Sequence, residues 1–183
     1  DKDFIAKLET YSLPQLLEDS GLPTVLGGRP TGFVPTSYVD VDNHAGARLA
    51  VDHLVAGGRR RIATIAGPQD MSAGVARLEG YRDALRDAGL LDDSKELVAY
   101  GQFGESSGQV AMQELLSRRS DIDAVFAASD PMAFGAMRAI KRAGHRIPDD
   151  VAVVGFDGSP AAGNTEAPAM YRLSTPPSVA APV

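Results

Sequence analysis

Four short apolar runs, separated by segments of helical periodicity, constrain the fold of this chain more than any other feature. They occupy residues 61–66, 96–100, 124–128 and 151–155. Short apolar runs that end in glycine or polar residues are typical of buried β-strands. Strands that alternate with helices form parallel sheets with helices on their faces. The sequence therefore predicts an α/β fold, a Rossmann-like parallel sheet flanked by helices.

Four segments with apolar residues three and four positions apart are predicted to be helices. They begin near Asn43, Ser72, Ser106 and Asp130. They end near Gly57, Ala88, Arg119 and Gly144. Asn43 and Asp130 are predicted N-cap residues, because their short side chains accept hydrogen bonds from the first N–H groups of a helix.

Polar, glycine and aromatic residues follow each predicted strand directly. They are residues 67–69, 102–103, 129–130 and 156–157. The carboxyl ends of parallel strands meet at one edge of a sheet, and small molecules bind in the crevice outside that edge. We therefore expect these residues to form a ligand-binding site.

Composition argues against several classes of protein. Among 183 residues, 44% are apolar and 23% are charged, and no run approaches the roughly 18 apolar residues of a membrane span. The net charge of −6 argues against a broad basic face that holds DNA. The chain has no cysteine, which excludes disulfides and thiolate metal sites and fits a cytoplasmic protein. The three histidines lack the spacing of metal ligands, so we expect neither a metal nor a cofactor.

A G-x-S-x-G sequence at residues 104–108 raises the alternative of a hydrolase. Ser106 would be the nucleophile, His145 the base, and Asp123 or Asp130 the acid. Ser106 follows a predicted strand and His145 precedes one, so the two lie at opposite ends of the sheet, roughly 15 Å or more apart. A base has to be within hydrogen-bond reach of its nucleophile. We therefore expect that the chain is not an enzyme, and that this segment forms a turn and a helix cap.

Five segments, taken in order along the chain, are similar to a known family. They are residues 38–50, 61–68, 76–81, 128–140 and 147–157, and the fourth reads ASDPMAFGAMRAI. Together they resemble the effector-binding core of the lactose-repressor/galactose-repressor family of bacterial transcription regulators. The resemblance implies two Rossmann-like subdomains joined by crossing strands, as in the related periplasmic sugar-binding proteins.

The resemblance also implies a division of the chain. Residues 1–40 are expected to be a remnant of the first subdomain, residues 41–172 a nearly complete second subdomain, and residues 173–183 an irregular tail. The prolines at positions 176 and 177 oppose a central strand in that tail.

The resemblance implies four ligand-binding residues at the carboxyl edge of the sheet, namely Arg77, Phe103, Ser129 and Asp157. An arginine at the position of Arg77 binds ligand hydroxyls or a carboxylate in relatives, and its planar group with five donors suits such contacts. Phe103 corresponds to an aromatic residue that stacks on the apolar face of a sugar. Ser129 replaces an asparagine common in relatives, and Asp157 would accept hydrogen bonds from two sugar hydroxyls.

These residues also have structural interpretations. Arg77 could be a surface residue near the start of its helix, and Phe103 could pack in the core. Asp157 could form a turn. In the first subdomain, Gly28 and Arg29 are further candidates for the opposite wall of the site.

The sequence thus predicts the effector-sensing domain of a DNA-binding transcription regulator, whose two lobes close around a sugar or a sugar-like metabolite. Operator DNA would bind through a helix-turn-helix that is absent from this chain. The regulator would be a cytoplasmic homodimer, with Phe134, Met137 and Arg138 on the dimer face. Two alternatives remain open: the solute-binding protein of a sugar transporter, which uses the same lobes as a monomer, and a truncated domain that binds no ligand.

Overall fold

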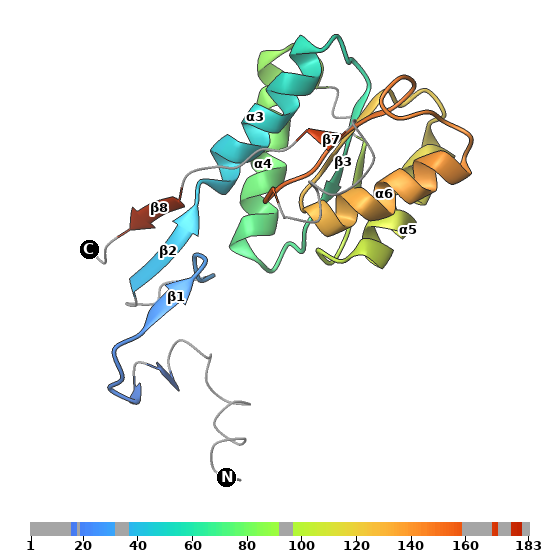
Figure 1. The fold of residues 1–183 in the computed structure, drawn as a ribbon. Coiled ribbons are helices and arrows are strands. Elements are labelled where there is room, and N and C mark those ends of the chain that lie inside the picture. Colours follow the sequence, from blue (N-terminus) through green and yellow to red (C-terminus); the bar gives the residue numbers. More distant parts are fainter. Residues whose placement is uncertain are drawn as a thin grey trace. The chain divides into compact units, whose positions relative to one another are not determined.

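The computed structural model describes residues 16–17, 19–31, 37–91, 97–158, 170–171 and 177–180 (Figure 1). The chain divides into two compact units. The smaller unit comprises Asp1–Val41 and Pro176–Val183, and the larger unit comprises Asp42–Thr175. Within the described ranges, no helix combines the length and the apolar character that crossing a membrane requires.

The described part of the smaller unit contains a three-stranded sheet in the order β1-β2-β8. Strand β1 (Val25–Gly27) runs parallel to β2 (Ser37–Val41), and β2 runs antiparallel to β8 (Pro177–Ala180). The sequence predicts an irregular tail from residue 173, whereas residues 177–180 form a strand. Pro177 is compatible with this strand because it is the first residue of an edge strand, a position that tolerates the missing N–H.

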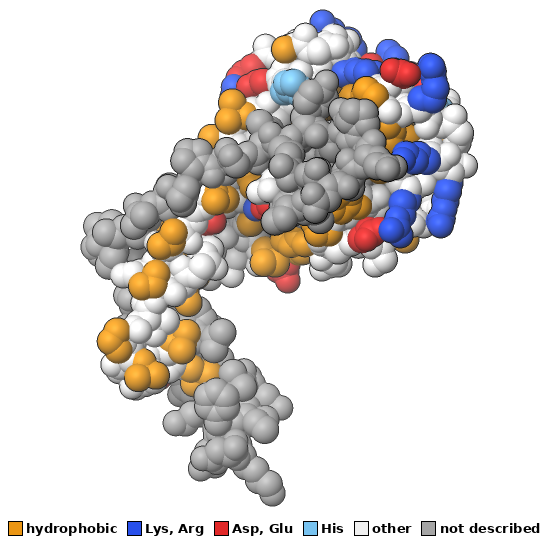
Figure 2. Space-filling model, viewed as in Figure 1, with side chains coloured by type: hydrophobic (Ala, Val, Ile, Leu, Met, Phe, Trp, Pro, Cys, Tyr) orange, Lys and Arg blue, Asp and Glu red, His pale blue; other side chains and the backbone are white. Residues whose placement is uncertain are grey.

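The described part of the smaller unit buries little of its surface. None of its described residues up to position 41 is buried, and Leu22 and Val25 are 66% and 64% exposed. Figure 2 shows hydrophobic side chains on the surface of this unit. A sheet needs a packed partner to bury its apolar face. Among the described residues, the buried core is therefore in the larger unit.

The larger unit contains a five-stranded parallel sheet in the order β4-β3-β5-β6-β7. Its strands are β3 (Ile62–Ala66), β4 (Val98–Tyr100), β5 (Ala124–Ala127), β6 (Ala152–Val154) and β7 (Met170–Tyr171). The first four correspond to the apolar runs, so those predictions are confirmed. Strand β7 is not predicted, because it has two residues and follows a segment without apolar periodicity.

Four helices cover this sheet, namely α3 (Asn43–Ala56), α4 (Ser72–Asp87), α5 (Glu105–Arg118) and α6 (Asp130–Arg142). Helix α3 packs with α4 on one side of the sheet, and α5 packs with α6 on the other side (Figure 1). The predicted Rossmann-like sheet with flanking helices is confirmed. The strand order reverses between β3 and β5, since β4 lies on one side of β3 and β5 on the other. Ligands of such sheets bind outside the carboxyl ends of the strands at this switch point.

Two predicted N-caps are each wrong by one residue. In α3 the cap is Asp42, whose Oδ1 accepts the backbone N–H three residues later at 2.9 Å. In α6 the cap is Ser129, whose Oγ accepts the backbone N–H three residues later at 3.3 Å. Asn43 and Asp130 are instead the first helical residues, and both are buried. Both helices start with two adjacent residues that are able to cap, and in each pair the second one turns inward.

Helices α5 and α6 approach closely at two glycines. A Cβ at Gly135 would lie 2.0 Å from the backbone oxygen of Glu105, and a Cβ at Gly108 would lie 2.3 Å from that of Met132. These separations are far inside van der Waals contact. Only glycine at these two positions permits the observed helix packing.

Gly135→Ala is therefore expected to lower the free energy of unfolding by about 1–3 kcal/mol, the usual cost of overpacking an interior. Urea denaturation followed by circular dichroism measures this loss. Gly57→Ala is the matched control, because Gly57 has an ordinary φ of −73° and a Cβ there would lie 3.4 Å from its nearest neighbours. Equal stabilities of the two variants would contradict the close helix contact.

Candidate ligand-binding site

Arg77 lies at the centre of the carboxyl edge of the larger sheet. It is in the second turn of α4, which follows β3, and it is only 7% exposed. Its side chain reaches residues that follow β5 and β6, and it therefore spans the switch point of the strand order. The alternative that Arg77 is a surface arginine is excluded by this burial.

Asn43, Ala128 and Asp157 are among the polar groups around the Arg77 guanidinium. Its Nε–H donates a hydrogen bond to Asn43 Oδ1 at 2.8 Å, and its Nη1–H donates to the backbone oxygen of Ala128. Its Nη2 lies 3.5 Å from Asp157 Oδ1. The first two bonds join the guanidinium to two separate elements and fix its plane, whereas the third distance is at the outer limit of a hydrogen bond. The site thus holds a fixed cation beside a loosely paired carboxylate.

Two aromatic rings lie against the same guanidinium. Arg77 Cζ is 3.7 Å from the centroid of the Phe156 ring and 5.6 Å from that of Phe103. Such cation–π contacts stabilise a buried arginine. Phe103 also packs on the backbone of Gly67, where a Cβ would lie 2.4 Å from the ring, and against the hydrophobic core. Phe103 therefore belongs both to the core and to the cluster around Arg77.

Phe103 and Asp157 have strained backbone conformations. Their φ angles are +57° and +91°, and within the described residues no other non-glycine residue has a positive φ. A positive φ is a genuine outlier for a bulky residue such as phenylalanine. Residues in such conformations persist where their surroundings hold them, and they are concentrated at functional sites. Both lie at the carboxyl edge of the sheet, so the strain supports a functional role for this edge.

Asp157 is the most exposed charged group of the cluster, with 49% of its side chain exposed. Burial of the remainder raises the pKa of its carboxyl above the ordinary value of 3.8, against the opposing charge of Arg77, and Asp130 adds to the rise. A carboxylate that stabilises a fold through an ion pair has a lowered pKa instead. The surroundings of Asp157 therefore do not favour its charge in the absence of a ligand.

The Ser129 hydroxyl is used within the protein. Its Oγ–H donates to the backbone oxygen of Phe103 at 3.1 Å, and its oxygen accepts the capping bond from the Met132 N–H. A hydroxyl has one hydrogen to donate, so Ser129 cannot donate to a ligand while this bond persists. The hydroxyl connects the start of α6 to the strained residue Phe103. A direct ligand contact of Ser129 remains a prediction.

The residues predicted at the dimer face lie on α6 and differ in exposure. Phe134 is partly buried against the hydrophobic core, and Met137 is buried within it at 5% exposure. Arg138 is exposed, and its Nη1 lies 2.9 Å from Glu105 Oε1. Met137 therefore offers little surface to a partner, whereas Phe134 and Arg138 remain candidates.

Gly28 and Arg29 directly follow β1 in the smaller unit. The Gly28 N–H donates to the backbone oxygen of Val39 at 2.8 Å, and the Arg29 N–H donates to Asp40 Oδ2 at 3.2 Å. These bonds tie the residues after β1 to the neighbouring strand β2. A ligand role for either residue remains a prediction.

The G-x-S-x-G segment forms the turn before α5 and its first residues. Ser106 is the second residue of α5 at the carboxyl edge, whereas His145 lies between α6 and β6, at the amino edge. The two residues thus lie at opposite edges of the sheet, so His145 is not within reach of Ser106 as a hydrolase would require. Ser107 has the structural role here, since its Oγ accepts the Gln102 N–H at 2.9 Å and donates to the Gly104 oxygen at 2.7 Å. In the described ranges, no three His, Asp or Glu side chains are arranged to hold a metal ion.

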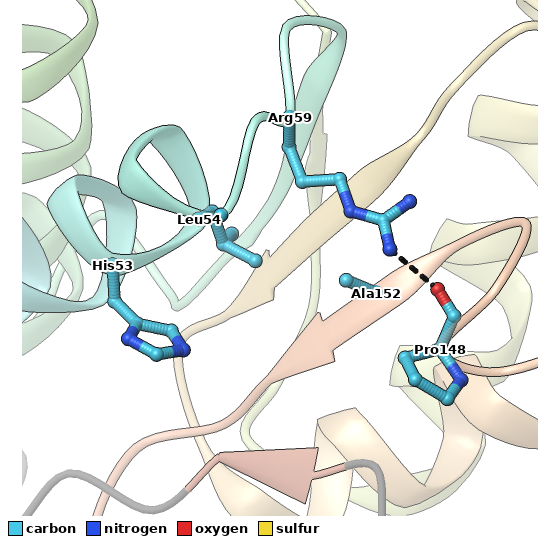
Figure 3. A pocket seen from close by; sticks show the side chains of 6 residues that line it. His53, Leu54, Arg59, Pro148 and Ala152 are labelled. Carbon is cyan, nitrogen blue, oxygen red and sulfur yellow. Dashed lines mark hydrogen bonds between the residues drawn. The ribbon is translucent and has the colours of Figure 1, made fainter.

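A pocket lies at the opposite, amino edge of the same sheet (Figure 3). It is lined by His53, Leu54, Gly57, Arg59, Pro148 and Ala152. Arg59 donates hydrogen bonds to the backbone oxygens of Pro148, Asp123 and Asp149 at 2.7, 3.2 and 3.3 Å. These bonds join turns of the larger unit, so the Arg59 cation serves the fold. The cluster around Arg77 is therefore the better candidate site.

The sequence predicts Phe156 at this edge of the sheet without a role beside Arg77, and it does not predict Asn43 as a member of the cluster. The sequence predicts Asn43 to be an N-cap, but Asn43 precedes the buried residues Ala47 and Ala50 by four and seven positions. Residues at this spacing share one face of a helix. The spacing therefore contains a signal that Asn43 faces inward.

Comparisons with known proteins identify the family. The periplasmic binding protein-like domain family matches residues 51–177. The HTH-type transcriptional regulator CelR of Thermobifida fusca is 56% identical over 159 residues, which are 85% of this chain and 46% of that protein. The HTH-type transcriptional repressor CytR of Escherichia coli (strain K12) is 42% identical over 135 residues, which are 74% of this chain and 39% of that protein. The chain thus spans less than half the length of these relatives.

Solved structures that are similar to this chain are also those of transcription regulators. The transcriptional regulator CelR–cellobiose complex is similar with a TM-score of 0.78 and 45% identity, over 91% of this chain and 61% of that one. A regulatory protein of the LacI family from Chloroflexus aggregans is similar with a TM-score of 0.76 and 33% identity, over 88% of this chain and 58% of that one. The resemblance inferred from five sequence segments is confirmed. The chain belongs to the LacI family of transcriptional regulators, and its fold is that of their periplasmic-binding-protein-like domain.

Proposed function

We propose that the chain is the effector-binding region of a sugar-responsive transcription regulator, and that the sugar binds beside Arg77, Phe103 and Asp157. The main support is the fixed guanidinium of Arg77 next to a half-exposed and loosely paired carboxylate at the switch point of the sheet. The complex of the similar regulator CelR with cellobiose supports a sugar as the class of ligand.

The charges of the cluster suit a neutral, polyhydroxylated ligand. Arg77 and Asp157 have opposite charges 3.5 Å apart, so the pair has no strong preference for an anion. The guanidinium donates to hydroxyl oxygens and the carboxylate accepts from hydroxyl hydrogens, so adjacent hydroxyls of one sugar can bind both groups. The partly buried ring of Phe103 offers a flat apolar surface to the carbon face of the sugar. Ser129 would contribute by holding Phe103 in place.

The partners of the whole protein are part of the same proposal. Operator DNA would bind through a helix-turn-helix outside this chain, as the names of the HTH-type relatives suggest, and the regulator would be cytoplasmic and would act by binding rather than by catalysis. It would be a homodimer, with Phe134 and Arg138 as the first residues to test. Residues 1–40 and 41–172 would belong to two lobes that close on the sugar. The sugar must bind one lobe arrangement better than the other, and its coupling to operator affinity is then reciprocal.

Calorimetric titration of the full-length regulator with cellobiose, maltose and ribose tests this proposal. At least one sugar is expected to give saturable binding, and the same sugar is expected to change operator affinity in a DNA-binding assay. A protein that binds DNA but gives no heat and no change in operator affinity with any sugar would contradict the proposed function.

A further inference from the structure

Asn43 joins helix α3 to the cluster at the carboxyl edge. Its side chain is 5% exposed, and its Oδ1 accepts the Arg77 Nε–H at 2.8 Å across 34 positions of sequence. Asn43 is not required to begin α3, because Asp42 caps that helix. The buried amide therefore has a role apart from capping, and that role involves Arg77.

The Nε bond controls the direction in which the guanidinium points. Asn43 holds Nε from α3, Ala128 holds Nη1 from the end of β5, and the Phe156 ring covers one face at 3.7 Å. Without the Nε contact, the guanidinium could pivot about the Nη1 bond, and Nη2 would move relative to Asp157. An arginine side chain has many rotamers, and fixing it before the ligand arrives removes that ordering from the cost of binding.

We propose that Asn43 is a positioning residue, which holds the Arg77 guanidinium in the orientation that a sugar hydroxyl requires. This inference rests on the proposed function of the cluster. Asn43 acts through Arg77 and does not itself contact the ligand. Its contribution is preorganisation of the site rather than a further hydrogen bond to the sugar.

Two substitutions at Asn43 separate the hydrogen bond from the packing. Asn43→Leu has a similar volume and lacks the acceptor, whereas Asn43→Asp retains an acceptor for the Nε–H. Titration of the full-length regulator with cellobiose is expected to show about 10- to 100-fold weaker binding for Asn43→Leu and binding within about threefold of wild type for Asn43→Asp. Arg48→Ala is the matched control on the same helix, since the Arg48 guanidinium pairs with Asp87 at the surface, and it is expected to leave affinity unchanged.

A double-mutant cycle distinguishes positioning from a merely structural role. Lysine has no Nε–H, so in the Arg77→Lys background Asn43→Leu is expected to change cellobiose affinity by no more than about twofold. A purely structural role would give the same loss of affinity in both backgrounds. Such an equal loss, or wild-type affinity in a fully folded Asn43→Leu protein, would overturn the inference. If Asn43→Leu does not fold, the smaller Asn43→Ala takes its place with the same expectations.

A measurement without ligand keeps this inference separate from the proposed function. In proton–nitrogen spectra, the Arg77 Nε–H signal is assigned by its loss in Arg77→Lys. It is expected to be protected from exchange with water in the wild type and in Asn43→Asp, and to lose that protection in Asn43→Leu. If no sugar binds the wild type, the proposed function fails. An unprotected Nε–H in the wild type overturns the role of Asn43 instead.

Discussion

Replacing Arg77 with alanine is expected to weaken sugar binding by about 100-fold or more, equivalent to roughly 3 kcal/mol. Hydrogen bonds from a charged donor contribute about 1.5–3 kcal/mol each, and the proposed ligand would receive at least one from this guanidinium. The change also removes the cation against which Phe103 and Phe156 pack. Calorimetric titration with the bound sugar measures the loss.

The same change is expected to lower the free energy of unfolding by about 1–3 kcal/mol, because it removes the donors that Asn43 and the Ala128 oxygen now accept from. Affinity must therefore be compared under conditions in which the variant is fully folded, as shown by urea denaturation. Arg77→Lys retains the charge and lacks the planar fork of donors, so its affinity is expected to lie between those of the wild type and of Arg77→Ala.

Arg86→Ala is the matched control for Arg77→Ala. Arg86 lies on the same helix, its side chain is 59% exposed, and it pairs with Asp83 at the surface. Exposed ion pairs of this kind contribute little because solvent screens them, so stability should change little and sugar affinity should not change. If folded Arg77→Ala binds sugar as tightly as Arg86→Ala does, the cluster around Arg77 is not the ligand site.

The central strands could be predicted from the sequence because burial on both faces makes a strand apolar throughout. All five residues of β3 are buried, and so are all four of β5. Strands β7 and β8 could not be predicted, since they depend on pairing with a distant segment. Strand β7 exists because Met170 pairs with Val153, and β8 because it pairs with β2. Neither pairing leaves a periodic pattern in two or four residues.

The cluster of Arg77, Phe103 and Asp157 at the carboxyl edge was predictable, but the bonds within it were not. Arg77 and Asp157 are 80 positions apart. The rule that ligands bind at the carboxyl edge selects Asp157, which follows a strand, whereas Arg77 lies within α4 and is selected by the family resemblance. The partners of each side chain depend on which of two adjacent polar residues turns inward. Asn43 and Asp42 are equally able to cap a helix, so propensity alone does not separate them.

The dimer face stays a prediction, and Met137 offers it little surface because this side chain is only 5% exposed. The excess of apolar residues on α6 indicates that more than one side of this helix is buried. The sequence does not tell whether these residues pack against another element of the chain or against a partner subunit. Gly135 permits close packing of α5 on α6, and Met137 belongs to the same core cluster as Ala111, Met112 and Leu115 of α5. Helix α5 therefore buries part of the apolar surface of α6, and no partner subunit is required to bury Met137.

Asp157→Asn is expected to weaken sugar binding by about 10- to 100-fold while leaving the stability of the protein unchanged or slightly higher. The amide retains the size of the side chain but has one oxygen in place of two charged ones, so it loses charge-assisted bonds to hydroxyls of about 1.5–3 kcal/mol. Asparagine also tolerates the φ of +91° at this position, which alanine does not. Titration calorimetry and urea denaturation of the same preparation measure the two quantities.

The stability expectation follows from the direction of the pKa shift. Burial raises the pKa of Asp157 above 3.8, so the stability that this group contributes is present at low pH and is lost as pH rises through the raised pKa. At neutral pH the charged form therefore does not stabilise the fold, and a neutral amide in its place should not destabilise it. A large loss of stability in Asp157→Asn would contradict this expectation.

Acid is expected to weaken sugar binding, although it does not remove the contribution of Asp157 to the stability of the fold. Lowering the pH through the raised pKa protonates Asp157 and removes the acceptors for sugar hydroxyls, so wild-type affinity should fall, and the fall should begin above the pH expected for an ordinary aspartate. The residual affinity of Asp157→Asn has no such titration and should stay constant over the same range. Because the wild-type fold does not lose the contribution of Asp157 in acid, weaker binding there cannot be attributed to unfolding caused by this residue. Wild-type and Asp157→Asn proteins that bind equally at neutral pH, or that lose affinity in parallel on acidification, would remove Asp157 from the site.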